Sequence, residues 1–216
     1  MGYGAVLDRL IPEEAHVPAN LAAAAALLVA ARASGVTLDE LGISPARFGS
    51  GLRVGAVAAI PVVAGVAAAA SFGGTRRFFD DNRVSDVSSR RAAYETAVRI
   101  PVGTALGEEL IFRGALLALF ARERSVPRAV LASSALFGLW HVLPALRSPA
   151  AEPGGGLARR ARFAAGTVAV TALAGVGFAQ LRIRSRSVLA PAVVHGALNI
   201  SAYVATRLLA RHGTGP

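Results

Sequence analysis

The chain has 216 residues, enough for one domain, and 54% of them are hydrophobic whereas only 17% are charged. Soluble domains carry about a quarter of charged residues, so this composition favours a chain that lipid partly solvates. The net charge is +10, and arginine is the only basic residue type. The arginines lie in clusters between apolar runs, without an array of stacking aromatic residues, which argues against a nucleic-acid partner. The lack of cysteine excludes disulfides, thiolate catalysis and cysteine-bound metals.

The N-terminal stretch, residues 1–16, contains Asp8, Glu13 and Glu14 and lacks the basic start of a signal peptide. It is therefore expected to be kept, as a cytoplasmic or interfacial segment. Apolar segments suited to crossing a membrane follow in chain order, at about 17–31, 54–74, 100–121, 129–146, 163–181 and 187–206.

These apolar runs lack the alternation of apolar and polar residues that marks barrel strands, and a backbone in lipid must satisfy its own hydrogen bonds. We therefore predict an all-α fold, a polytopic transmembrane helix bundle of about six spans over residues 17–210, followed by a C-terminal tail at 211–216. The predicted location is the cell membrane, as a multi-pass protein. The excess of arginine on the side of the two termini places both termini in the cytoplasm.

The third span carries the charged residues Glu108, Glu109 and Arg113. A charge at the centre of a membrane helix costs at least about 2.5–3.5 kcal/mol, so these side chains are expected to face the protein interior. Glu109 and Arg113 lie one turn apart on one face and can pair. Glu108 is rotated from Glu109 by about 100° and has no such partner on its own helix, which leaves its carboxylate free for chemistry.

The fourth and sixth spans each contribute a histidine. Phe137 and His141 share a face of the fourth span, and His195 and Asn199 share a face of the sixth. Each element alone is compatible with structure: an ion pair in a transport path, a histidine between two helices, or polar contacts between helices. Their conjunction favours catalysis, with Glu108, His141, His195 and Asn199 converging on one cavity within the bundle.

A carboxylate with two histidines permits two hydrolytic chemistries. Glu108 can act as general base on a water while a histidine shares the proton and other donors stabilise an oxyanion. Alternatively, Glu108, His141 and His195 can bind a divalent metal such as zinc, although no cofactor is firmly implied because the usual zinc-peptidase helix motif is absent. Two functions of other classes remain open, a proton-coupled transporter and a catalytically silent immunity or scaffold protein.

The same three elements resemble the signature of the CPBP family of intramembrane proteases, the CAAX protease and bacteriocin-processing (Abi) family. That signature is Glu-Glu-x-x-x-Arg, then Phe-x-x-x-His, then His-x-x-x-Asn or Asp. The sequence carries it in this order within residues 104–203, and the matching positions are Glu108, Glu109, Arg113, Phe137, His141, His195 and Asn199. The alanine-rich usage with arginine as the only basic residue favours a bacterial source.

The resemblance implies an intramembrane endopeptidase that cuts a membrane-associated protein or peptide. By position, Glu108 looks like the general base and His141 like its catalytic partner. His195 and Asn199 look like the pair that stabilises the oxyanion. Glu109 and Arg113 look structural or substrate-positioning, with Phe137 supporting them. The expected partners are this substrate and the lipid bilayer, whereas the oligomeric state is left open.

Overall fold

The computed structural model describes residues 15–79, 84, 87–146, 148 and 156–212, apart from the side chains of Arg77 and His212. The predicted N-terminal segment, except for its last two residues, and residues 213–216 of the predicted tail lie outside the described residues. The described part of the chain is helical and contains no strand, as predicted for an all-α protein.

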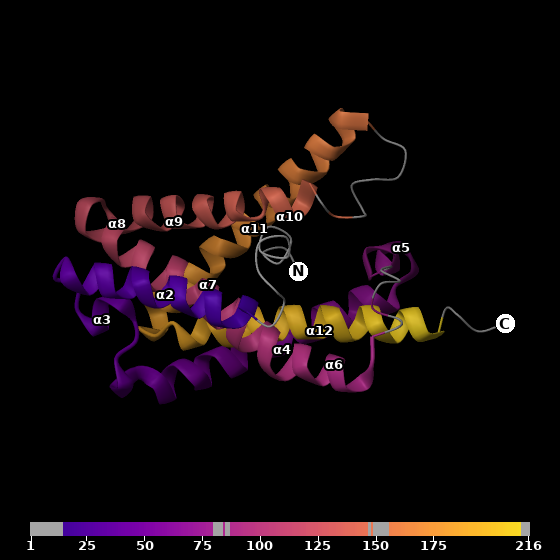
Figure 1. Cartoon of the computed structure of the whole chain (residues 1–216), viewed down its shortest axis with the longest axis horizontal. Helices are drawn as coiled ribbons and strands as arrows, with labels where there is room; N and C mark the ends of the chain where they lie inside the picture. Colours follow the sequence, from indigo (N-terminus) through magenta and orange to yellow (C-terminus); the bar gives the residue numbers. More distant parts are fainter. Residues whose placement is uncertain (1–14, 80–83, 85–86, 147, 149–155, 213–216) are drawn as a thin grey trace.

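Figure 1 shows the helices in one bundle. The elements in chain order are α2 (His16–Ala33), α3 (Leu38–Leu41), η2 (Pro45–Arg47), α4 (Phe48–Ser71), α5 (Gly73–Arg76), η3 (Arg77–Phe79), α6 (Ser89–Tyr94), η5 (Glu95–Leu106), α7 (Gly107–Glu109), η6 (Leu110–Leu116), α8 (Leu117–Glu123), α9 (Val126–Trp140), α10 (Val142–Leu146), α11 (Gly156–Ser185) and α12 (Leu189–His212).

Among the described residues, 5 helical segments are long and apolar enough to cross a membrane. They are His16–Ala33, Pro45–Ser71, Val126–Leu146, Gly156–Ser185 and Leu189–Arg211. The short first segment, His16–Ala33, is among them by length and composition. The remaining predicted span, 100–121, lies inside the continuous helical run from α6 to α8, where its charged residues set it apart from the apolar helices.

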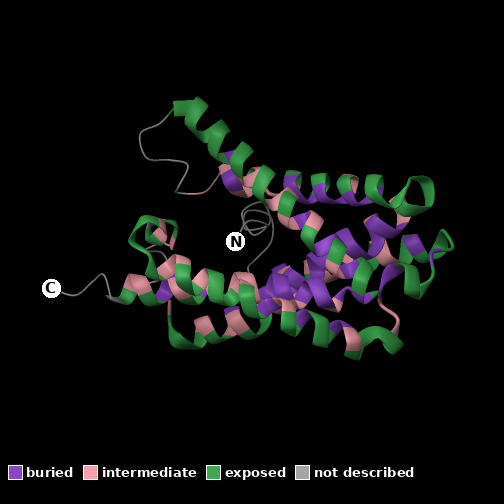
Figure 2. Ribbon diagram, turned by 180° about the vertical axis from the view of Figure 1, so that it is seen from behind, coloured by how far each residue is buried: buried purple, intermediate pink, exposed green. Residues whose placement is uncertain are grey.

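The outward faces of these helices are apolar. Side chains such as Val57, Ile60, Val170 and Leu173 are each more than two-thirds exposed, while the buried residues gather where the helices cross (Figure 2). A continuous apolar exterior of this kind suits hydrocarbon rather than water. The arrangement therefore supports a helix bundle whose outer surface faces lipid.

Two helix pairs, α4 with α12 and α9 with α11, pack so closely that glycine is required at the contact. A Cβ on Gly55 of α4 would lie 2.8 Å from the Ala190 carbonyl oxygen and from the Val193 Cβ on α12. A Cβ on Gly138 of α9 would lie 2.7 Å from the Val168 carbonyl oxygen on α11. Small residues at such contacts let membrane helices approach by van der Waals packing.

The run that carries the acidic pair is largely a π-helix, with wider turns than an α-helix. The π-helical stretches η5 and η6 flank the three residues of α7, and Pro101 lies within η5. Proline removes a backbone donor, and π-helical turns are frequent at functional sites. The acidic pair therefore lies at a local change of helical geometry.

The loop after α2 is held by arginines from distant helices. Arg122 donates to the carbonyl oxygens of Ser34 and Gly35 at 3.0 and 2.8 Å. Arg182, buried on α11, donates to the carbonyl oxygens of Asp39 and Glu40 at 3.1 and 2.6 Å. The bonds of Arg122 satisfy backbone acceptors just after the end of α2, and those of Arg182 go to backbone acceptors within α3.

The start of α3 is a capping box. The Thr37 hydroxyl accepts from the Glu40 backbone N–H at 3.2 Å, and the Thr37 backbone N–H donates to the Glu40 carboxylate at 2.7 Å. The hydrogen bonds from Thr37, backbone first and then hydroxyl, together with Arg122, lower the pKa of Glu40 to about 2. Glu40 is thus held as a carboxylate at the surface.

Candidate active site

Glu109 is the centre of the buried polar cluster. One of its carboxylate oxygens, Oε1, accepts from Arg113 Nη1 at 3.1 Å and from His195 Nδ1 at 3.0 Å. Glu109 and Arg113 have 0% exposed surface, and His195 has 4%. The predicted pair of Glu109 with Arg113 is therefore present. The same carboxylate, on α7, also binds His195 of α12 and so joins these two helices.

Glu108 stands beside this cluster and is 5% exposed. Its Oε2 lies 3.9 Å from His195 Nε2, too far for a direct hydrogen bond. The same oxygen is buried and has no hydrogen-bond partner among the described residues. A buried carboxylate oxygen without a partner is costly, and a bound water or a substrate group would satisfy it.

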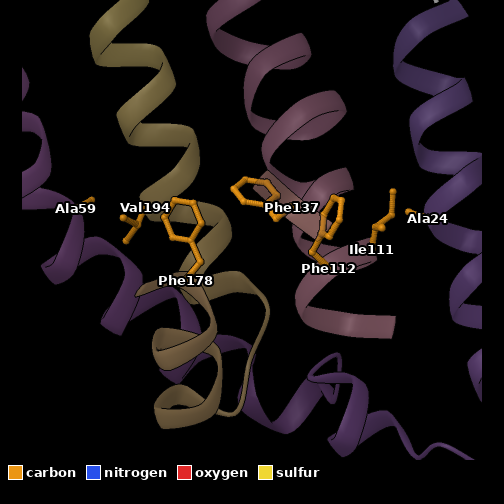
Figure 3. Close-up of a cluster of buried hydrophobic side chains, with 7 residues drawn as sticks. All are labelled: Ala24, Ala59, Ile111, Phe112, Phe137, Phe178 and Val194. Atoms are coloured by element: carbon orange, nitrogen blue, oxygen red, sulfur yellow. The ribbon is translucent and has the colours of Figure 1, made fainter. Parts of the chain in front are cut away.

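Arg113 is enclosed by three aromatic rings from three different segments. Its guanidinium carbon lies 4.1 Å from the ring centre of Phe137, 5.3 Å from that of Phe178 and 5.8 Å from that of Phe112. Phe137 lies between the other two rings in the core cluster (Figure 3). A cation over aromatic faces gains attraction that adds to its ion pair, so Phe137 acts here as support for the charged cluster.

The ring of His195 is fixed from two sides. It stacks on Phe178, with ring centres 5.1 Å apart and 20° between the planes, and it meets the edge of Phe137 at 5.8 Å. Because Nδ1 faces a carboxylate oxygen, that nitrogen is the donor of the bond to Glu109. The other ring nitrogen, Nε2, is thereby directed at Glu108.

His141 lies where α9 ends, since its backbone leaves the helix and α10 starts at the next residue. Its Nδ1 faces the Phe137 carbonyl oxygen at 2.7 Å and therefore donates to it. The ring packs against Phe137 at 4.8 Å and is half-buried. The Phe137 ring meets both histidines, with ring centres 4.8 Å from His141 and 5.8 Å from His195.

Asn199 is one turn beyond His195 on α12 and is half-buried. Its amide makes no hydrogen bond within the part of the chain that the structure describes, so it is free to bind a ligand. Within the same residues, no three histidine or acidic side chains are gathered to hold a metal ion. A metal held by Glu108, His141 and His195 stays a prediction.

The structure thus brings Glu108, Glu109, Arg113 and His195 together, with Phe137 packed on the cluster. It places His141 at the end of a neighbouring helix, and it shows no direct contact of Asn199 with these side chains. Sequence reasoning missed Phe178, which stacks on His195, because it belongs to no motif and only the fold brings α11 to this place. It also missed that Glu109 serves His195 as well as Arg113.

Comparison with known protein families supplies an independent observation. The family model described as "Type II CAAX prenyl endopeptidase Rce1-like" matches residues 92–201, a segment that contains every residue of the three motifs. The chain belongs to this family. No curated protein and no solved structure matches it.

From its membership of this family the chain is a protease of the CAAX endopeptidase class. Its apolar helices show that it is a multi-pass membrane protein. The matched segment begins in α6 and ends within α12. It therefore spans the helical run with the acidic pair, the helix that ends at His141, and the helix that carries His195. The predicted membership of an intramembrane CAAX-type protease family is confirmed.

Proposed function

We propose that this protein hydrolyses a peptide bond of a membrane-associated protein or peptide, at the cell membrane, with Glu108 as the general base. The observation that carries the proposal is the buried Glu108 carboxylate oxygen without a hydrogen-bond partner, 3.9 Å from His195 Nε2. A base must present an accessible lone pair to a water. Glu109 Oε1 already accepts two bonds, and Glu109 Oε2, although it has no partner, belongs to a side chain with 0% exposed surface, whereas Glu108 is 5% exposed.

In the proposed reaction Glu108 takes a proton from water and the resulting hydroxide attacks the scissile carbonyl carbon. The carbonyl oxygen becomes an oxyanion, the carbon–nitrogen bond breaks, and the leaving amine takes the proton from Glu108. His141 shares the proton transfer through Nε2, since its Nδ1 is engaged with the Phe137 carbonyl oxygen. The Asn199 amide and His195 Nε2 donate to the oxyanion.

Charge balance supports this role of His195. With Nδ1 donating to Glu109, His195 can donate from Nε2 only when both ring nitrogens are protonated. The charges of Glu108, Glu109, Arg113 and His195 then cancel, as a buried cluster requires. When Glu108 accepts the proton, the cluster becomes positive at the moment when the oxyanion becomes negative, and the two charges attract in a medium of low dielectric constant.

The test compares Glu108→Gln with Glu123→Gln, an exposed glutamate at the end of the same helical run. Membranes from cells with each variant are analysed by mass spectrometry for newly formed peptide termini. We expect the cleavage products of the wild type to fall by about 10²–10⁴-fold in Glu108→Gln, the usual contribution of general base catalysis, and to persist in Glu123→Gln. Unchanged products in Glu108→Gln would exclude the role of Glu108.

Treatment of the same membranes with a chelator tests whether cleavage requires a divalent metal ion. If Glu108, His141 and His195 hold a divalent ion, cleavage stops on chelation and returns when zinc is added, and the ion is found in the purified wild type. If Glu108 acts without a metal, chelation leaves the products unchanged while Glu108→Gln still removes them.

A further inference from the structure

A groove on the outside of the bundle lies between the C-terminal parts of α4 and α12. It has a volume of about 440 Å³, and its walls are mainly apolar, with Val63 and Ala67 from α4 and Val204 and Leu208 from α12. Arg76, at the end of α5, also lines it. A groove of this size in a lipid-facing surface accepts a single hydrocarbon chain.

The groove is separate from the candidate active site. At about 100° per residue, Val204 and Leu208 point away from the side of α12 that carries His195. No motif residue lines the groove. An occupant of the groove therefore need not be the substrate of the peptidase.

Arg76 gives the groove a charge at one end. The side chain is exposed, and its guanidinium forms no ion pair or hydrogen bond with the part of the chain that the structure describes. A guanidinium presents paired donors that match the oxygens of a phosphate. An apolar groove that ends at an exposed guanidinium therefore matches a molecule with a hydrocarbon chain and an anionic head.

We propose that this groove binds an anionic phospholipid, with an acyl chain between α4 and α12 and the phosphate at Arg76. Among the described residues that line the groove, Arg76 is the only charged one, so it supplies the attraction for a negatively charged headgroup. Basic pockets between membrane helices bind anionic head groups by this combination. A zwitterionic lipid has the same chains but lacks the net attraction.

The first experiment measures lipid binding to the purified full chain by native mass spectrometry. Phosphatidylglycerol and phosphatidylcholine with the same acyl chains are added separately. We expect the wild type to prefer phosphatidylglycerol. Arg76→Gln should bind phosphatidylglycerol about fivefold more weakly, because one basic residue contributes about this much to binding of an anionic lipid. It should bind phosphatidylcholine as the wild type does. Arg90→Gln, an exposed arginine of α6 outside the groove, is the control and should bind both lipids like the wild type.

The second experiment fills the groove. Ala67→Leu places a larger side chain on the wall of the groove and should weaken the binding of both lipids. Ala68→Leu changes an exposed neighbouring residue outside the groove and should weaken the binding of neither lipid. The proposal is overturned if Arg76→Gln keeps the preference, if Arg90→Gln loses as much, or if Ala67→Leu binds like the wild type. It is also overturned if a farnesylated peptide displaces the lipid, or if Ala67→Leu abolishes a dimer, since the groove would then hold substrate or a second copy.

Discussion

Two adjacent glutamates have different surroundings in this protein. Each keeps its Oε2 without a hydrogen-bond partner among the described residues. Glu109 is fully enclosed and its Oε1 accepts from both Arg113 and His195, whereas Glu108 is 5% exposed and lies 3.9 Å from His195 Nε2. Through Oε1, Glu109 holds Arg113 and His195 in place. Glu108 makes no such pair of bonds, and it is the less enclosed of the two carboxylates. Replacement of the two carboxylates should therefore have different consequences.

Glu109→Gln is expected to lower the free energy of unfolding by about 3–5 kcal/mol, because it leaves the buried Arg113 without its ion-pair partner. Thermal unfolding in detergent is the measurement. Glu108→Gln is the matched control and should lower the melting temperature less than Glu109→Gln, because it keeps the Glu109–Arg113 pair. Equal melting temperatures for the wild type and Glu109→Gln would show that this pair does not hold the bundle together.

Local spacing made part of the site predictable. Glu109 and Arg113 are one turn apart on one helix, so their pairing needs no knowledge of the fold. The bond from His195 to Glu109 was not predictable, because it joins positions 86 residues apart in sequence and depends on how α12 packs. Phe178 likewise reaches His195 only through tertiary packing. The catalytic roles of Glu108, His141, His195 and Asn199 stay predictions.

At the scale of elements, the four-residue helix α3 depends on a distant arginine. Arg182 reaches from α11 to the carbonyl oxygens of Asp39 and Glu40. Arg182→Ala is expected to lower the free energy of unfolding by about 1.5 kcal/mol, because two hydrogen bonds from a charged donor to backbone acceptors are lost. Arg184→Ala, an exposed arginine of the same helix, should leave the thermal unfolding of the purified protein unchanged. If both variants lowered the melting temperature equally, the effect would be due to the loss of a positive charge and not to the hydrogen bonds of Arg182.

The capping box of α3 predicts a dependence of stability on pH. Hydrogen bonds from Thr37 lower the pKa of Glu40 to about 2 from an ordinary value of 4.5. A lowered pKa in the folded state stabilises the fold above pH 4.5, and the contribution is lost as the pH falls towards 2. Glu40→Gln should therefore melt below the wild type at pH 6, and this difference should shrink at pH 3. A difference independent of pH would contradict the role of the carboxylate.

Element boundaries show where sequence reasoning stops. The apolar runs predicted the long helices, because a segment that must satisfy its backbone in lipid is helical. They did not predict that the fourth segment breaks at His141 or that the helix with the acidic pair has π-helical turns. Both features change the direction of site side chains without changing hydrophobicity, so composition and periodicity carry no sign of them.

At the scale of the whole molecule, the contact of α4 with α12 supports the helix that carries His195. Gly55→Leu would force these helices apart, since even a Cβ lies 2.8 Å from Ala190 and Val193, and overpacking of this kind costs about 1–3 kcal/mol. Gly65→Leu on the same helix is the control, because a Cβ there meets nothing within 4 Å. We expect a lower melting temperature and weaker cleavage for Gly55→Leu alone. If Gly65→Leu matches it, the effect is not one of packing.

The enclosure of Arg113 has a consequence for how the protein is made. Its ion-pair partner Glu109 comes from its own helix, but the Phe178 ring comes from α11, and the His195 that shares Glu109 comes from α12. During synthesis the charged helix is therefore complete long before the residues that enclose it. We infer that this helix stays at the insertion machinery, or at the edge of the bilayer, until the last helix has emerged, so that a nascent chain ending before α12 would fail to keep it in the membrane.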